Sequence, residues 1–137
     1  MNKNQRTTYD IIVIGGGITG AGIARDCALR GLKVLLVEKF DMTNGATGRN
    51  HGLLHSGARY AVTDNESATE CIQENMILRK IARHCVEETD GLFITLPEDD
   101  LSYQKTFVTA CQNAGIRADI IAPEEAIRLE PAVNPTL

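Results

Sequence analysis

The sequence predicts an α/β fold built on a doubly wound parallel sheet. Three observations carry this prediction: an apolar, β-branched run at residues 9–14, a helical stretch at 19–30, and a second apolar run at 33–38. A strand, a helix and a strand within thirty residues form a right-handed βαβ crossover, which requires parallel strands. Because the first strand is almost uniformly apolar, we expect it to be buried on both faces.

The later elements are predicted from periodicity and turn residues. Residues 40–60 are rich in Gly, Thr, Asn and His and are typical of a long loop that carries functional residues. A long helix follows, with Thr63 and Glu66 at capping-box spacing. The apolar face of this helix comprises Ala68, Cys71, Leu78, Ala82 and Cys85. We expect strands at 92–96 and 119–122, and helices at 101–114, closed by Gly115, and at 123–129.

A doubly wound sheet needs several parallel strands, and only the first βαβ unit is convincingly present. We therefore expect the fold to be incomplete, with these residues forming an N-terminal piece of a longer chain.

Composition bounds the function. The chain has 137 residues, 43% of them hydrophobic, and a net charge of −4. This is enough apolar material for a packed core, and the acidic balance gives no electrostatic basis for nucleic-acid binding. No stretch approaches the roughly 18 apolar residues of a membrane span, so we expect a cytoplasmic location. The four cysteines have no zinc or redox spacing and are expected to be reduced and mostly buried.

Gly15, Gly17 and Gly20 form a G-x-G-x-x-G motif between the first strand and the first helix. The first glycine permits a tight turn, the second lets the backbone approach a pyrophosphate, and the third lets helix and strand pack closely. The helix N-terminus then offers its N–H groups to the anion. Glu38 ends the second strand, where a carboxylate can accept ribose hydroxyls and disfavours the 2′-phosphate of NADP. The loop alone does not decide between FAD and NAD.

Residues 45–60, with the sequence GATGRNHGLLHSGARY, decide between these cofactors. Together with residues 14–26, IGGGITGAGIARD, they closely resemble the FAD-dependent glycerol-3-phosphate dehydrogenases, most of all the large catalytic subunits of the anaerobic type. The resemblance runs across essentially the whole chain. It implies a Rossmann-like FAD-binding fold of the D-amino-acid-oxidase-like or glutathione-reductase type. It places the N-terminal part of the FAD-binding domain at 1–88 and the start of a substrate domain at 89–137.

The activity that the resemblance implies is oxidation of sn-glycerol 3-phosphate to dihydroxyacetone phosphate. Electrons would pass from FAD to a quinone pool in anaerobic glycerol metabolism. The expected partners are other subunits of a membrane-associated dehydrogenase complex. Through them the cytoplasmic chain would lie peripherally on the inner face of the cytoplasmic membrane.

The resemblance also implies site residues. Arg59 is the expected ligand of the substrate phosphate, for which its planar guanidinium is suited. The general base is expected beyond residue 137, so the catalytic residues are left unknown and the fragment alone is expected to be inactive. The candidate FAD contacts of the segment that follows the second strand are Thr47, Asn50, His51, Gly52 and Leu53.

Several residues invite other roles. His51 and His55 are candidates for a general base because histidine is a common acid–base residue, but a loop histidine beside a cofactor is more often an orienting partner than a base. His84 is expected to face solvent at a helix end. Asp99 and Asp100 are typical of a solvated turn, so we assign no metal.

Two other functions stay open. The same fold serves flavin enzymes that oxidise other hydroxy or amino acids, and the guanidinium of Arg59 also fits a carboxylate. The other alternative is a non-catalytic nucleotide-binding module, although the apolar strand at 34–37 would then be left partly uncovered.

Overall fold

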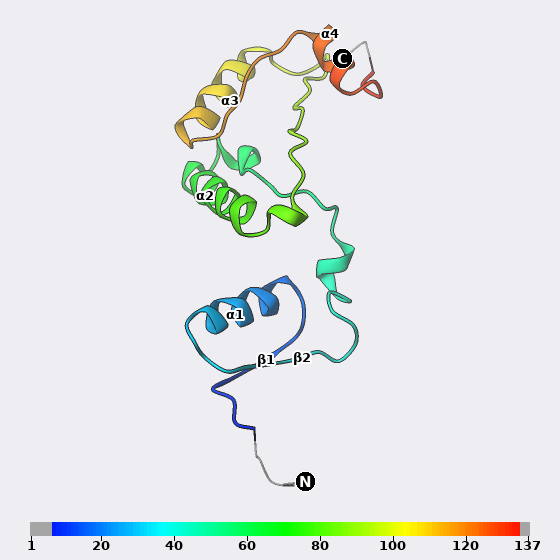
Figure 1. The fold of residues 1–137 in the computed structure, drawn as a ribbon. Coiled ribbons are helices and arrows are strands. Elements are labelled where there is room, and N and C mark those ends of the chain that lie inside the picture. Colours follow the sequence, from blue (N-terminus) through cyan, green and yellow to red (C-terminus); the bar gives the residue numbers. More distant parts are fainter. Residues whose placement is uncertain (1–6, 135–137) are drawn as a thin grey trace. The chain divides into compact units, whose positions relative to one another are not determined.

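The computed structural model describes residues 7–134, and contacts divide the chain into two compact units, Met1–Leu53 and Leu54–Leu137 (Figure 1). Each unit is described by itself. The boundary between the units differs from the domain boundary expected after residue 88, which lies inside the second unit. That domain boundary stays a prediction.

The first unit is the predicted βαβ crossover. Strand β1 (Ile11–Ile14) leads into helix α1 (Ile18–Leu29), and the chain returns as strand β2 (Val34–Val37). The strands pair in parallel, with Ile11 opposite Val34 and Ile14 opposite Val37. The predicted α/β class and the parallel pairing are confirmed.

The sheet is covered less than the sequence predicts. Helix α1 packs on β1 and β2 and lies along one side of the strands (Figure 1). Val13 is the buried residue of β1, while Ile12 is 60% exposed and Ile14 is 87% exposed. The expectation that β1 is buried on both faces is therefore wrong for the described residues. A strand of this kind is buried on both faces only when helices cover both faces of its sheet, and here one helix covers one face.

The second unit is helical. Its elements are α2 (Asn65–Ile81), α3 (Ser102–Asn113) and α4 (Pro123–Leu129), with short 3-10 turns η2 (Ala58–Tyr60) and η3 (Arg83–Cys85). The three predicted helices are present. The core is built mostly from small side chains, which let the helices approach closely. Its buried residues are Ala58, Ala61, Ala68, Cys111 and Ala114, together with the larger Ile116.

Helix α2 begins and ends differently from the prediction. Its N-cap is Asp64, whose carboxylate accepts hydrogen bonds from the Ser67 N–H at 3.0 Å and the Ser67 hydroxyl at 2.7 Å. The predicted capping box of Thr63 and Glu66 is wrong, because the carboxylate one residue later already satisfies the free N–H group at the helix start. The helix ends at Ile81 and does not continue to Cys85.

The two later strands are not formed. Residues 92–96 and 119–122 have no strand structure, and in the described chain only β1 and β2 pair. A strand requires a neighbour for its backbone groups, and no such neighbour lies beside these runs. Phe93 instead packs against Phe107 of α3, with ring centroids 4.7 Å apart.

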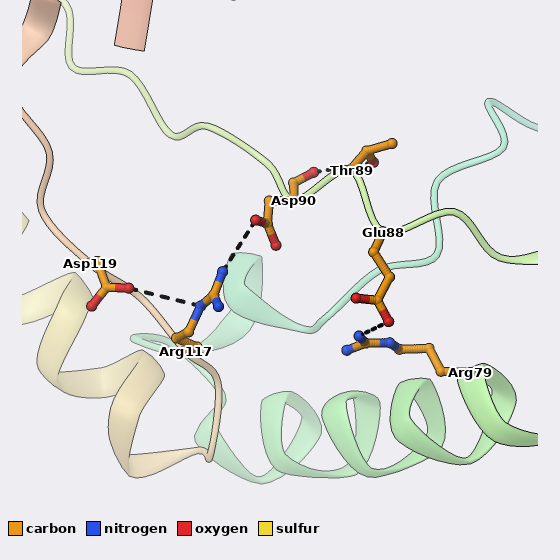
Figure 2. A network of polar contacts seen from close by, with 6 residues as sticks. All are labelled: Arg79, Glu88, Thr89, Asp90, Arg117 and Asp119. Atoms are coloured by element: carbon orange, nitrogen blue, oxygen red, sulfur yellow. Dashed lines mark hydrogen bonds and ion pairs between the residues drawn. The ribbon is translucent and has the colours of Figure 1, made fainter. Parts of the chain in front are cut away.

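The segment that follows α2 is held by exposed ion pairs (Figure 2). Arg79 of α2 pairs with Glu88, and Arg117 reaches Asp90 at 3.2 Å and Asp119 at 3.8 Å. Such pairs contribute little stability each in water, so they guide the path of this segment more than they hold the fold together.

All four cysteines are free thiols, as expected, but the expectation that they are mostly buried is wrong. Cys111 is buried, Cys27 and Cys71 are half-buried, and Cys85 is exposed. Of the helices that the structure describes, none has the length and apolar character needed to cross a membrane.

Replacing the N-cap of α2 tests its assignment. Asp64→Ala removes the acceptor of the Ser67 N–H, so we expect a lower Tm of the full-length protein that contains this chain. Thr63→Ala is the matched control and leaves the Tm unchanged. Hydrogen bonds from the hydroxyl and N–H of Ser67 lower the pKa of Asp64, so the difference between Asp64→Ala and wild type is present at neutral pH and shrinks as the pH falls through that lowered pKa. A larger decrease in Tm for Thr63→Ala than for Asp64→Ala would support the capping box of Thr63 and Glu66 instead.

Candidate functional site

The loop between β1 and α1 leaves the carboxyl edge of the sheet. The Gly15 N–H donates to the carbonyl of Val37 at 2.8 Å, which ties the start of the loop to the end of β2. Gly15 has a φ of +109°, a backbone conformation that side chains disfavour. The chain can therefore turn sharply from the strand into the helix only because this residue is glycine.

Gly20 makes the tightest contact in the loop. A Cβ at this position would lie 1.9 Å from the carbonyl oxygen of Gly15 and 3.4 Å from Cγ1 of Val13. The first turn of α1 thus rests directly on the backbone where β1 ends. This is the close packing of helix on strand that the third glycine of the motif is expected to permit.

Glu38 closes the loop from the end of β2. Its Oε2 accepts a hydrogen bond from the Gly16 N–H at 2.6 Å, and its Oε1 accepts one from the Phe40 N–H at 3.0 Å. The Gly16 N–H is the largest cause of the lowered pKa of this carboxyl, followed by the Phe40 N–H. The group is therefore ionised at neutral pH. Each carboxylate oxygen keeps a further acceptor site, which suits ribose hydroxyls.

The segment after β2 folds back onto the glycine loop. Oγ1 of Thr47, in the 3-10 turn η1 (Ala46–Arg49), accepts a hydrogen bond from the Ile18 N–H at 3.1 Å. The Thr43 N–H donates to the carbonyl of Gly16 at 3.0 Å. A Cβ on Gly17 would lie 3.0 Å from the Thr47 hydroxyl oxygen. Thr47 thus sits at the N-terminus of α1, where the motif is expected to receive a pyrophosphate.

Two neighbours of the loop were missed from the sequence. A Cβ on Gly16 would lie 2.5 Å from the sulfur of Met42, so Met42 packs over the middle glycine. Thr43 adopts a φ of 61°, which turns the chain back toward the loop. Neither residue stands in a motif, and their spacing from the glycines carries no signal.

Residues 50–53 form a turn stabilised by their own side chains. The Asn50 amide donates to the carbonyl of Thr47 and accepts from the Gly52 N–H, and Nδ1 of His51 accepts from the Leu53 N–H at 3.0 Å. Gly52 has a φ of +75°. With Nδ1 accepting, the neutral His51 ring carries its proton on Nε2. The role of His51 as an orienting residue stays a prediction.

Arg59 lies in the second unit, in turn η2. Its side chain is exposed, and among residues 7–134 no ion pair involves it. Its immediate neighbours Ala58 and Ala61 are buried, with 7% and 2% exposure. The backbone of Arg59 is thus anchored while the guanidinium is available to an anion.

Asp99 and Asp100 accept hydrogen bonds from nearby backbone N–H groups. Asp99 accepts from the Leu96 N–H at 2.7 Å, and Asp100 accepts from the Ser102 N–H at 2.8 Å. Both carboxylates are thereby used in a turn and at the start of α3. Within residues 7–134, no group of three or more His, Cys, Asp or Glu side chains is placed to hold a metal ion. His84 is exposed in η3.

The site geometry fits a dinucleotide. Gly15, Gly17 and Gly20 place no side chain at the start of the helix, Glu38 stands ionised beside the loop, and the Thr47 hydroxyl accepts the Ile18 N–H there. The N-terminus of a helix suits a pyrophosphate, and the carboxylate suits a ribose. The structure brings these five residues together in the first unit, and residues 50–53 follow in the same unit.

Comparison with known proteins agrees with a dinucleotide-binding protein. The family model described as DAO, FAD dependent oxidoreductase, matches residues 10–137, and the chain belongs to this family. Its cofactor is therefore FAD, and its fold is that of the FAD-binding domain of the family. The expected Rossmann-like fold, present here in part, is confirmed.

The individual relatives narrow the class. The chain is 69% identical over 137 residues to a subunit of the anaerobic glycerol-3-phosphate dehydrogenase of Escherichia coli (strain K12), covering 100% of this chain and 25% of that protein. It is 58% identical over 127 residues to a subunit of the anaerobic glycerol-3-phosphate dehydrogenase of Haloferax volcanii, covering 93% of this chain and 22% of that protein. It is 41% identical over 100 residues to the alpha-glycerophosphate oxidase of Enterococcus casseliflavus, covering 72% of this chain and 16% of that protein.

The predicted resemblance is therefore confirmed across the whole chain. The chain spans about a quarter of the length of the anaerobic dehydrogenase relatives that it matches. No solved structure matches it.

The contact of Gly20 with Gly15 gives a sharp test of the loop. Gly20→Ala places a Cβ against the Gly15 carbonyl, so we expect at least about tenfold weaker FAD binding by the full-length protein. Gly22→Ala is the matched control in the same helix, because nothing lies within 4 Å of its Cβ position. Alanine there favours the helix by up to about 1 kcal/mol. Flavin absorbance after gel filtration measures FAD retention in both variants. Equal retention in the two variants would contradict the close-packed loop.

Replacing Glu38 tests the acid beside the loop. Glu38→Gln removes the negative charge of the carboxylate whose oxygen accepts a hydrogen bond from the Gly16 N–H. FAD affinity is therefore expected to fall about tenfold. Because the pKa of Glu38 is lowered, the contribution of its carboxylate to folding stability is fully present above the ordinary value of 4.5 and is lost as the pH falls through the lower folded value. Flavin retention at neutral pH measures the affinity, and Tm measured against pH reports the contribution to stability. Glu74→Gln, an exposed change on α2, is the control, and wild-type retention in Glu38→Gln would remove this role.

Proposed function

We propose that the full-length protein containing this chain is an FAD-dependent dehydrogenase of sn-glycerol 3-phosphate. The proposed reaction yields dihydroxyacetone phosphate, with electrons passing through FAD to a quinone pool in anaerobic glycerol metabolism. The observation that carries the proposal is the glycine loop closed by Glu38 and Thr47, in a chain 69% identical over its whole length to a relative named for this activity.

The proposed FAD contacts divide between two parts of the first unit. Gly15, Gly17 and Gly20 receive the pyrophosphate at the start of α1, and Glu38 accepts the ribose hydroxyls. Thr47 and residues 50–53 supply the further contacts to FAD. FAD, when bound, would supply the acceptor for the hydride of the substrate.

Arg59 is the proposed ligand of the substrate phosphate. A guanidinium presents two parallel N–H donors to two phosphate oxygens, a geometry that lysine lacks. The exposed side chain on an anchored backbone supports this role. We place no general base within the chain. We further propose that 1–88 belong to the FAD-binding domain and 89–137 begin the substrate domain.

The proposed partners follow from the names of the relatives. Several are named as one subunit of a dehydrogenase, which implies further subunits in those proteins. We propose that the present chain also works with partner subunits and that they hold it peripherally at the inner face of the cytoplasmic membrane.

Arg59→Ala tests the substrate site. Loss of charged hydrogen bonds to the phosphate is expected to raise KM for glycerol 3-phosphate about 10- to 100-fold in the full-length enzyme, measured by dye reduction. Arg59→Lys keeps the charge, and its KM is expected to lie between the values of the wild type and of Arg59→Ala. Arg25→Ala, an exposed change on α1, is the control.

An unchanged KM in Arg59→Ala would remove this residue from the phosphate site. A panel of other hydroxy and amino acids, assayed with the wild-type enzyme, tests the substrate itself. Faster turnover of a carboxylate substrate than of glycerol 3-phosphate would overturn the proposed activity.

A further inference from the structure

Asn75 is the buried polar side chain of the described residues. It lies on α2, is 8% exposed, and no charged side chain within residues 7–134 is buried as deeply. A buried amide without partners costs free energy, so a position of this kind is kept only where its hydrogen bonds are made.

The partners of Asn75 lie on the backbone of the preceding loop. Its Nδ2 donates to the carbonyl of Leu54 at 3.2 Å and to the carbonyl of His55 at 3.2 Å. The amide nitrogen carries two hydrogens, one for each bond. One side chain of α2 thus holds two consecutive peptide groups, four residues before Arg59.

The same loop is held again nearer the start of α2. Gly57 has a φ of +89°, and a Cβ there would lie 2.7 Å from the carbonyl oxygen of Ala68 and 2.7 Å from Cβ of Cys71. Because α2 rises 1.5 Å per residue, the two attachments are about 10 Å apart along the helix. Residues 54–57 therefore run along α2, from Asn75 toward its N-terminus.

The backbone on the far side of Arg59 is also fixed. The Asp64 N–H donates to the carbonyl of Tyr60 at 2.7 Å, and Ala61 belongs to the core cluster. Of the three attachments around Arg59, the hydrogen bonds of Asn75 are the ones made by a side chain that can be replaced without altering the loop itself.

We propose that Asn75 is a positioning residue for the substrate site: it holds residues 54–59 against α2 so that Arg59 presents its guanidinium from a fixed backbone. The proposal rests on the proposed function of Arg59. A loop that is not held in advance must be ordered when the substrate binds, and this ordering weakens binding without changing the reaction of the bound substrate. Loss of Asn75 is therefore expected to act on KM rather than on kcat.

Two variants remove the donor with little change of shape, Asn75→Asp and Asn75→Leu. Gln73→Glu and Gln73→Leu are matched controls at an exposed position of the same helix. In the full-length enzyme, both Asn75 variants are expected to raise KM for glycerol 3-phosphate about tenfold and to leave kcat within about twofold. Amide exchange of the peptide covering residues 54–60 is expected to become about tenfold faster. The Gln73 variants leave all three quantities at wild-type values.

The outcomes separate the two proposals. A lower Tm with unchanged KM and unchanged exchange of residues 54–60 would show a purely structural role and overturn the positioning role. The same holds if KM and kcat change equally. If the wild-type enzyme does not oxidise glycerol 3-phosphate, the proposed function fails, and the exchange measurement still decides whether Asn75 holds the loop.

Discussion

The backbone contact between Gly20 and the carbonyl of Gly15 is the constraint on which the first unit depends. With no side chain at Gly20, the first turn of α1 can rest on the end of β1, and the chain needs only a short turn to pass from strand to helix. The helix then begins at the carboxyl edge of the sheet, and its first N–H, that of Ile18, donates to the Thr47 hydroxyl. Any Cβ at that point would move the helix away and leave its N-terminus without a defined position.

The surroundings of this N-terminus come from residues that follow β2. Glu38 accepts the Gly16 N–H, and the hydroxyl of Thr47 accepts the Ile18 N–H. The loop is thus closed by an anionic group and a neutral group, while the helix dipole favours a further anion at its axis. In the proposed FAD site, the carboxylate and the helix N-terminus would complement the two chemically different parts of a dinucleotide.

In the second unit, a held backbone lies beneath the exposed side chain of Arg59. Small residues at Ala58, Ala61 and Ala68 allow the loop around Arg59 to lie against α2. Asn75 adds hydrogen bonds at the start of that loop. The buried side chains of this unit therefore lie under the backbone of Arg59, and its guanidinium is exposed.

By itself the sequence determined the fold class, the glycine loop and the family, because apolar runs, glycines and the motif at 45–60 are local features. The strands predicted at 92–96 and 119–122 failed, since a strand also needs a pairing neighbour, which no local pattern supplies. Only the tertiary structure decided that Glu38 accepts the Gly16 N–H, that Thr47 closes the start of α1, and that Asn75 holds the backbone before Arg59. These hydrogen bonds join residues about twenty to thirty positions apart, so the path of the folded chain chooses their partners. A side chain that can donate or accept looks the same in the sequence whether or not a partner reaches it.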